Sequence, residues 1–598
     1  MWSVIFLVPA LLLLLLAVLQ TRSFFEYCKR QKRKGRRAPK TLAGITWLLY
    51  LCGGSFLLLS LVVSSVGGNN GPAQPPLITQ PQATKPQITF QAAMTDDTDP
   101  LNWRIRWEVF EKGRLTATYR RAEAISFGDA ADYTDLAGVT TFRGNNYRNS
   151  ASYGTANIVE KTLKTLWTHN TGTIKGGSWS GNGWTGQPLI VQWDDETRQL
   201  MNIYRDKKNK TDLVEVIYAS LDGKIYFMDL ADGTDTRDPL DIGLCFKGAG
   251  TLDPRGYPLL YVGAGDVNSL DERPRMYIIS LITGEVIYQY GDHDQLAYRT
   301  DNDQWCAFDA APLIHAETDT LIWPGENGIL YTVKLNTKYD PAAGSISVAP
   351  LEMVTTRYLT ERTNPTDYWC GYEASPVIVG NYLYTSENGG MFYCIDLNTM
   401  ELVWAQDTKD DSNSTPVFEK VGEDAGYLYT APSLHWTKNS SNQGTISIYK
   451  LDAVTGEIIW EVPYNVYTVS GVSGGVQASP VLGKPGTDLE GMVFYAIART
   501  NSKESGTLVA LDTQTGQEKW RLEMDYYAWS SPLAVYDQQG HGYIVQCDSY
   551  GNATFLDSQG NVVDTLFLGG NTEASPAAFN DMIVVGTRLK KICGIKIR

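Results

Sequence analysis

Hydrophobic and polar positions follow different patterns along the chain. Met1 to Thr21 and Thr41 to Val66 are apolar runs without a charged residue. Each run is long enough to cross a bilayer as a helix. Beyond residue 88 short segments alternate apolar and polar positions, which is typical of β-strands with one buried face. The pattern therefore predicts two transmembrane helices (residues 1–21 and 41–66) followed by a large all-β domain.

Residues 67–140 connect the second apolar run to the main domain. Residues 67–87 are rich in Gly, Pro, Gln and Asn, which is typical of an extended linker. The alternating segments Trp103–Phe110 and Leu115–Tyr119 are separated by a short polar turn and predict a β-hairpin. We therefore expect a small β accessory element over residues 88–140.

A proline recurs directly before apolar strands, in most cases after a small residue. The eight pairs are Gln187-Pro188, Tyr257-Pro258, Ala311-Pro312, Ser375-Pro376, Thr415-Pro416, Ser479-Pro480, Ser531-Pro532 and Ser575-Pro576. Their intervals of 40 to 70 residues bracket the length of a four-stranded propeller blade with variable loops. Residues 141–598 are therefore predicted to form one β-propeller of eight blades, with seven blades as the alternative.

Several units end on a strand, a turn and a second strand that carries tryptophan. In Leu451–Trp460 and Leu511–Trp520 the turn has the form Asp-x-x-Thr-Gly, and tryptophan follows four residues after the glycine. Asp can bind backbone amides of the turn, Gly supplies a positive φ, and Trp can cover the flank between blades. The last unit has too few residues for four strands, so we expect Leu163–Trp167 to complete it and close the ring.

These turns resemble the pyrroloquinoline-quinone-like repeat, and Thr141–Asn146 looks like the segment that precedes the first blade in that family. The resemblance implies a propeller fold from about residue 140 onward. The family includes quinoprotein dehydrogenases, which hold the quinone and Ca²⁺ in the central funnel. It also includes propellers without catalytic activity, such as the lipoprotein of the outer-membrane assembly machinery. The resemblance thus leaves both an enzyme and a binding scaffold open.

Charge is distributed unevenly and indicates a location. Residues 22–40 hold nine Lys or Arg against Glu26, so this stretch carries +8 and the remainder −23 of the total of −15. Basic loops stay cytoplasmic, which predicts a two-span protein of the cell membrane with an extracytoplasmic propeller. The alternative is that the second apolar run is a cleaved signal peptide. An acidic domain repels phosphates, so nucleic acid is excluded as a partner.

The residue three positions before each proline is predicted to line one mouth of the central channel, because side chains alternate along an extended chain. This candidate ligand-binding ring comprises Thr185, Arg255, Asp309, Glu373, Asn413, Gln477, Trp529 and Glu573. Three carboxylates and one arginine suit a cation, a sugar or a peptide better than a tricarboxylate quinone. The alternative is a solvated funnel without a ligand.

The resemblance also allows a test of the enzyme hypothesis. Quinoprotein alcohol dehydrogenases carry a Trp-Asp-x-Asp segment before a proline, whose first Asp is the catalytic base. The nearest match here is Trp305–Pro312, in which Cys306 occupies the position of the base and Asp309 is displaced by one position. No catalytic residue is therefore assigned.

We expect a membrane-anchored scaffold that binds a protein, a peptide or a cell-envelope glycan and needs no cofactor. The alternative is a dehydrogenase that uses pyrroloquinoline quinone with Ca²⁺ and passes electrons to the membrane. A membrane sensor is disfavoured, since the cytoplasmic loop is too short to hold a signalling domain. The sequence decides neither the ligand nor the oligomeric state.

Cysteine placement predicts one cross-link. Cys306 and Cys370 lie six residues before their prolines in consecutive units, so an inter-blade disulfide is a candidate in an oxidising compartment. Two buried thiols are the alternative. No Cys and His spacing indicates a zinc site, and the acidic loops do not match a calcium loop, so no metal is predicted.

Overall fold

The computed structural model describes residues 89–184, 186–265, 275–291, 294–299, 306–362, 370–469 and 473–598. The chain divides into two compact units, Met1–Ala83 and Thr84–Arg598. The two predicted transmembrane runs, the basic loop and the linker all lie outside the described residues. Among the residues described, no helix is long and apolar enough to cross a membrane.

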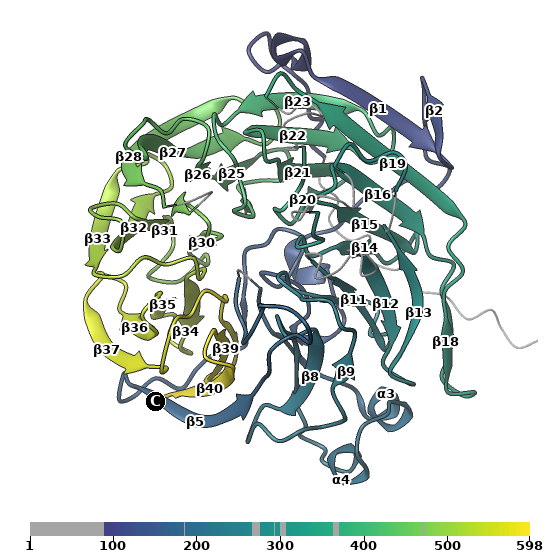
Figure 1. Ribbon diagram of the computed structural model, residues 1–598, viewed down its shortest axis with the longest axis vertical. Helices are drawn as coiled ribbons and strands as arrows, with labels where there is room; N and C mark the ends of the chain where they lie inside the picture. The colour runs from purple at the N-terminus through teal and green to yellow at the C-terminus, as the bar shows by residue number, and fades with distance from the viewer. Residues whose placement is uncertain are drawn as a thin grey trace, which may run out of the picture. The chain divides into compact units, whose positions relative to one another are not determined.

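The second unit is an all-β propeller whose eight sheets succeed one another around a centre (Figure 1). Blade 1 contains β3 (Ala137–Val139), β6 (Leu189–Gln192), β7 (Glu215–Ala219), β8 (Lys224–Asp229) and β9 (Leu240–Asp241). Blade 2 contains β10 (Thr251–Leu252), β11 (Leu259–Gly263), β12 (Met276–Ser280) and β13 (Glu285–Tyr290). Blade 3 contains β14 (Leu313–His315), β15 (Thr320–Pro324), β16 (Ile329–Lys334), β19 (Glu352–Leu359), β1 (Arg106–Glu111) and β2 (Arg114–Thr116).

Blades 4 and 5 have four strands each, and blade 6 has additional short strands. Blade 4 contains β20 (Val377–Val379), β21 (Tyr382–Ser386), β22 (Met391–Asp396) and β23 (Leu402–Asp407). Blade 5 contains β24 (Val417–Lys420), β25 (Gly426–Thr430), β27 (Gln443–Asp452) and β28 (Ile458–Tyr467). Blade 6 contains β26 (Ser433–Leu434), β29 (Gly474–Gly475), β30 (Val481–Leu482), β31 (Met492–Ala498), β32 (Gly506–Asp512) and β33 (Glu518–Met524).

The last two blades bring the ends of the sheet array together. Blade 7 contains β34 (Leu533–Tyr536), β35 (Gly542–Cys547), β36 (Asn552–Leu556) and β37 (Val562–Phe567). Blade 8 contains β4 (Ser152–Tyr153), β38 (Ala577–Phe579), β39 (Met582–Thr587), β40 (Lys591–Ile597) and β5 (Leu163–Asn170). Outside the blades lie the hairpin β17 (Lys338–Asp340) and β18 (Ser345–Ser347), helices α3 (Asp195–Leu200) and α4 (Arg205–Lys208), and the 3₁₀ turns η1 (Pro100–Trp103) and η2 (Ala130–Asp132).

Strand β5 closes the ring. It pairs antiparallel with β40, from Leu163 opposite Ile597 to Asn170 opposite Lys591, and the two strands lie side by side in Figure 1. An N-terminal strand thus supplies the outer edge of the last blade, which removes an open sheet edge. The predicted eight blades and their closure by residues 163–167 are both confirmed.

The predicted hairpin also forms, and it extends blade 3. Strands β1 and β2 pair with each other, and β1 pairs antiparallel with β19 from Arg106 opposite Leu359 to Glu111 opposite Val354. The segment therefore adds two outer strands to a blade. Further along, β3 pairs with β6, so blade 1 already begins at Ala137.

The small residues before the prolines join neighbouring blades in a collar of hydrogen bonds. At five of these positions the backbone N–H donates to the hydroxyl at the same position of the next blade, whereas Ser575 N donates to the carbonyl oxygen of Gly186. The donor and acceptor pairs are Ala311 to Ser375, Ser375 to Thr415, Thr415 to Ser479, Ser479 to Ser531, and Ser531 to Ser575, at 2.9–3.2 Å. The sequence signal thus marks the inner rim, where small hydroxyl side chains connect most of the blades.

Residues 140–148 fill the channel inside this collar and act as a plug. The buried guanidinium of Arg148 donates to the carbonyl oxygens of Pro376 and Ala311 at 2.9 and 2.8 Å. Arg143 donates to the carbonyl oxygen of Pro532 at 3.0 Å. Because these carbonyls belong to different blades, the plug ties the ring together from within.

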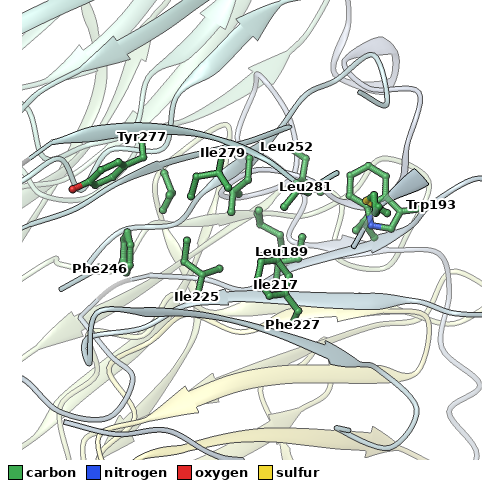
Figure 2. Close-up of a cluster of buried hydrophobic side chains, with 14 of the residues drawn as sticks. Leu189, Trp193, Ile217, Ile225, Phe227, Phe246, Leu252, Tyr277, Ile279 and Leu281 are labelled. Atoms are coloured by element: carbon green, nitrogen blue, oxygen red, sulfur yellow. The ribbon is translucent and has the colours of Figure 1, made fainter. Parts of the chain in front are cut away.

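Most of the core lies between the blades. Figure 2 shows one such cluster, in which Leu189, Ile217 and Phe227 of blade 1 lie near Leu252 and Ile279 of blade 2. Side chains that alternate along a strand point to opposite faces of the blade. Both faces are buried, because each blade packs between two others. We call the face at which the innermost strands begin the upper face and the opposite one the lower face.

Candidate ligand-binding site at the mouth of the channel

Four of the predicted ring residues form one connected group on the upper face. Asp309, Glu373 and Asn413 border a cavity of about 20 Å³, which has Phe142 of the plug on its other side. Asn413 donates to the side-chain oxygen of Gln477 at 3.1 Å. The cavity has room for one or two water molecules. Thr185 lies outside the described residues.

Arg255 is not part of this group, and the ring prediction is wrong for this blade. Arg255 lies in the turn between β10 and β11, on the lower face, because Pro258 precedes the second strand of blade 2 rather than the innermost one. The innermost strand begins at Thr251, so the position that corresponds to Asp309 is Lys247. Gly265 confirms this neighbourhood, since a Cβ on it would lie 3.2 Å from Asp309 Oδ1 and 3.4 Å from Lys247 Cδ.

Asn388 organises the acidic side of the mouth. Its amide nitrogen donates to Glu373 Oε1 and to Asp411 Oδ1, both at 2.9 Å. Burial raises the pKa of Asp411 well above its usual range, and the nearby charge of Glu373 acts in the same direction. A carboxyl with this environment favours the protonated form or a nearby cation.

A buried ion pair lies beside this group. Arg299 Nη2 contacts Glu326 Oε1 at 3.1 Å, and both side chains are at most 3% exposed. Burial raises the pKa of Glu326, the charge of Arg299 opposes that shift, and Glu373 adds to it. On this side of the mouth carboxyl groups therefore outnumber cations, and Arg299 is paired with Glu326.

Aromatic side chains gather on the opposite part of the mouth. Trp529 contacts Trp184 edge to face with ring centroids 5.7 Å apart, and Trp184 makes the same contact with Trp179. The ammonium of Lys247 lies 5.3 Å from the ring centroid of Trp184. The last predicted ring residue, Glu573, contacts Arg588 at 3.8 Å in this region. These half-buried rings offer stacking surfaces next to charged groups.

Comparison with known proteins identifies the repeat. Residues 369–526 and 416–591 match the family model described as outer membrane protein assembly factor BamB. The solved structure of BamB from Moraxella catarrhalis covers 64% of this chain and 91% of its own at 15% identity, with a TM-score of 0.41. The blades within residues 369–591 match the PQQ-like repeat.

A second relative is an enzyme. The quinohemoprotein alcohol dehydrogenase ADH-IIG from Pseudomonas putida is 25% identical over 159 residues, which are 25% of this chain and 19% of the enzyme. Its solved structure covers 80% of this chain and 83% of its own at 12% identity, with a TM-score of 0.47. The chain thus spans about a fifth of the length of this curated relative, and the activity of the relative is not transferred to it.

The two cysteines of the predicted disulfide are thiols in the PQQ-like propeller. Cys306 and Cys370 are both buried, and Cys306 Sγ lies 3.8 Å from the carbonyl oxygen of Arg299. Burial raises the pKa of Cys370 to about 11, so this thiol stays protonated at neutral pH. The predicted disulfide is therefore not formed in this structure, and the thiol alternative describes it.

Several residues of the mouth escaped the sequence analysis. Lys247 was missed because Gly250, and not a proline, precedes the innermost strand of its blade. Lys247 lies three residues before that glycine, so the position of the strand had to be known first. Asn388 and Glu326 lie in turns between the second and third strands, and Asp411 follows an outer strand. Their common place in the repeat is visible only once strands are assigned. Among the described residues, no group of three His, Cys, Asp or Glu could hold a metal ion.

Proposed function

We propose that this protein is a membrane-anchored extracytoplasmic scaffold that binds a protein, a peptide or a cell-envelope glycan at the upper mouth of its propeller. One observation carries the proposal: the mouth joins an aromatic cluster to a network of carboxylates and amides. Trp184 and Trp529 supply the rings, and Glu373, Asn413 and Gln477 supply the polar groups.

The geometry suits a ligand that has both an apolar face and hydrogen-bonding groups. Sugars and aromatic side chains stack on tryptophan, while carboxylates and amides hold hydroxyl or N–H groups at fixed positions. The plug and the collar make the mouth rigid, because Arg148 and the hydroxyl chain connect the blades beneath it. A rigid site loses little conformational entropy when the ligand binds.

The proposal favours a scaffold over an enzyme that uses pyrroloquinoline quinone. The cofactor is a tricarboxylate, and Asp309, Glu373 and Asp411 present carboxylates on one side of the mouth, where Arg299 is paired with Glu326. The cations Lys247 and Arg588 lie on the aromatic side. The enzymes that this chain resembles have a carboxylate base at the position that corresponds to Cys306. A buried thiol is a poor substitute for that base. We derive no catalytic step for this reason.

The membrane anchor in this proposal rests on the two apolar runs and the basic loop between them. A scaffold attached in this way stays close to partners in the envelope, which raises their effective concentration near the mouth.

The first experiment titrates the purified unit Thr84–Arg598, which has its own core, and the full chain in detergent. The probes are pyrroloquinoline quinone with Ca²⁺, oligosaccharides of N-acetylglucosamine, and an unstructured peptide rich in aromatic residues. Trp529→Ala and Glu373→Gln are the test variants, and Tyr543→Phe, on the lower part of blade 7, is the control. Glycan or peptide binding that both test variants weaken supports the scaffold.

Two other outcomes overturn the proposal. Saturable quinone binding with oxidation of alcohols by an added dye would make the protein a dehydrogenase. Binding of the glycan or peptide that neither Trp529→Ala nor Glu373→Gln changes would place the site elsewhere on the molecule.

A further inference from the structure

A second cavity opens on the lower face, far along the strands from the mouth. It has a volume of about 430 Å³ and is bordered by residues of blades 1, 2 and 3. This volume is in the range of pockets that bind small ligands or single side chains of a partner. We call it the lower pocket. Arg255, which the sequence placed in the upper ring, is one of its wall residues.

Two insertions between blade strands surround this pocket. Blade 1 carries residues 193–214, with α3 and α4, between β6 and β7, and blade 3 carries the β17–β18 hairpin between β16 and β19. Blade 2 lies between them with only a short turn. The two insertions meet over that turn, since a Cβ on Gly344 would lie 3.8 Å from Leu200 Cδ2. Insertions that converge on one cavity are typical of binding loops on a repeat scaffold.

The apolar part of the lower pocket consists of aromatic rings. Tyr257 and Tyr339 contact each other with ring centroids 4.9 Å apart and come from different blades. Trp193 forms part of the base and lies at one end of the cluster in Figure 2, where its indole N–H donates to Glu215 Oε2 at 3.0 Å. The base is therefore fixed by the core, while the tyrosine pair is half-buried and accessible.

The single arginine of the wall is neutralised. Arg255 contacts Asp253 at 2.6 Å and Asp319 at 2.7 Å, and its guanidinium covers Tyr257 at 4.5 Å from the ring centroid. Arg255 and its two aspartates together carry one negative charge. The position of Arg255 over Tyr257 shows that a cation fits against this ring. Tyr339, which packs against Tyr257, is half-buried and borders the pocket directly.

The other charges of the wall are carboxylates. Asp135 and Asp194 are exposed, and Asp194 caps α3 through Oδ1, which accepts from Thr197 N at 2.8 Å. Asp195 is paired with Arg198 at 2.7 Å. Asp135 and Asp194 thus present negative charge to the pocket beside tyrosine faces. This combination attracts a cation attached to an apolar stem.

We propose that the lower pocket binds an alkylammonium or guanidinium group, with its charge between Asp135 and Asp194 and its stem against Tyr339. The group belongs either to a free amine or to a Lys or Arg side chain of a protein. This site is separate from the upper mouth, so it stands whether or not the proposed function holds.

The test measures binding to the unit Thr84–Arg598 by calorimetry. The probes are cadaverine, N-acetyl-arginine amide and a tetralysine peptide with blocked ends, and the neutral controls are pentanol and maltotriose. We expect the cations to bind and the neutral probes not to bind. Affinity should fall as salt rises, because the carboxylates are exposed. Stronger binding of the peptide than of the free amines would identify a protein as the source of the cation.

Variants locate the binding. Asp135→Asn and Asp194→Asn should each weaken binding about tenfold, and the second keeps the helix cap because Asn also caps. Tyr339→Leu should weaken it without changing its dependence on salt. Asp525→Asn, at an exposed carboxylate of the upper face, is the matched control and should change nothing. Thermal unfolding of each variant verifies that it is folded.

Three results would overturn the proposal. One is the absence of binding by any cationic probe at about 10 mM, where even a weak site would be occupied. Another is equal binding of maltotriose, which would make the pocket a sugar site. The third is cation binding that Asp525→Asn weakens as much as Asp135→Asn, which would reduce the effect to the general acidity of the domain.

Discussion

The indole N–H of Trp167 donates to the carbonyl oxygen of Leu230 at 2.8 Å, and its ring lies on Gly233 of the same turn. Trp167 is on β5, the strand that closes blade 8, and the turn belongs to blade 1. This contact therefore joins the last blade to the first. Trp404, Trp460 and Trp520 cover Gly456, Gly516 and Gly560 of the following blades in the same way.

Substitution of this glycine is expected to loosen the closure. Gly233 has φ +72°, and a Cβ on it would lie 2.5 Å from the Trp167 ring. Gly233→Ala should lower the free energy of unfolding by about 2–4 kcal/mol, the sum of strain and overpacking. Urea unfolding monitored by tryptophan fluorescence measures this loss.

Gly486→Ala separates the two causes. Gly486 has φ +77°, and nothing lies within 4 Å of the position of its Cβ, so only the backbone strain applies. Its loss should be about 1 kcal/mol. Equal losses for both variants would show that the Trp167 contact adds nothing.

A buried ion pair within blade 1 should be sensitive to the removal of one partner. Arg237 contacts Glu215 at 2.7 Å, and the two side chains are 1% and 0% exposed. Arg237→Met leaves a buried carboxylate uncompensated and should cost about 3–5 kcal/mol of unfolding free energy.

The double variant Arg237→Met, Glu215→Gln tests the reason for that loss. Removing both charges should recover a large part of the stability, because the cost comes from the unpaired charge rather than from the lost attraction. Chemical unfolding of the two single variants and the double variant gives the coupling energy. Additive losses would contradict the explanation.

Glu387 should make stability depend on pH. Burial raises its pKa from 4.5 to about 7, against the hydrogen bonds that Gly389 N and Met391 N donate to it. Since the folded pKa is the higher one, this contribution is fully present below pH 4.5 and is lost as pH rises through about 7. The loss is about 3 kcal/mol at most.

Glu387→Gln is the matching variant, because glutamine keeps one of the two acceptor oxygens and does not titrate. The difference in unfolding free energy between wild type and variant, measured from pH 4 to pH 8, isolates this group. A difference that stays constant over this range would show that Glu387 has an ordinary pKa.

The state of Cys306 and Cys370 can be measured directly. Both thiols are buried, so we expect alkylation of their peptides without reductant only after the protein is unfolded. Mass spectrometry of tryptic peptides distinguishes the states. A peptide pair linked through these cysteines in protein secreted to an oxidising compartment would restore the disulfide that their matched positions predict.

Residue patterns predicted the fold well because a propeller repeats its local chemistry. The proline positions, the Asp-x-x-Thr-Gly turns and the tryptophans each depend on one blade and its neighbour, so they recur in the sequence. The closure by β5 followed from a shortage of strands in the last unit. The prediction failed for blade 2, at Pro258. In this blade the proline precedes the second strand, and Gly250 stands before the innermost strand.

The two candidate binding surfaces were less predictable, because they are built by residues that do not recur. The ring members Asp309, Glu373, Asn413 and Gln477 came from the repeat and were found, whereas Asn388 joins them from a turn of variable sequence. The lower pocket depends on Tyr257 and Tyr339, which are 82 positions apart and belong to different blades.

The sequence by itself determined the class of the fold, the number of blades and the strand that closes the ring, because hydrophobic alternation and turn chemistry are local properties. Only the tertiary structure decided which residues face the channel in blade 2, and that Arg255 belongs to the lower face. It also decided which insertions meet, as at Leu200 and Gly344. The physical reason is that contacts between distant segments depend on strand register and blade order, which no local pattern encodes.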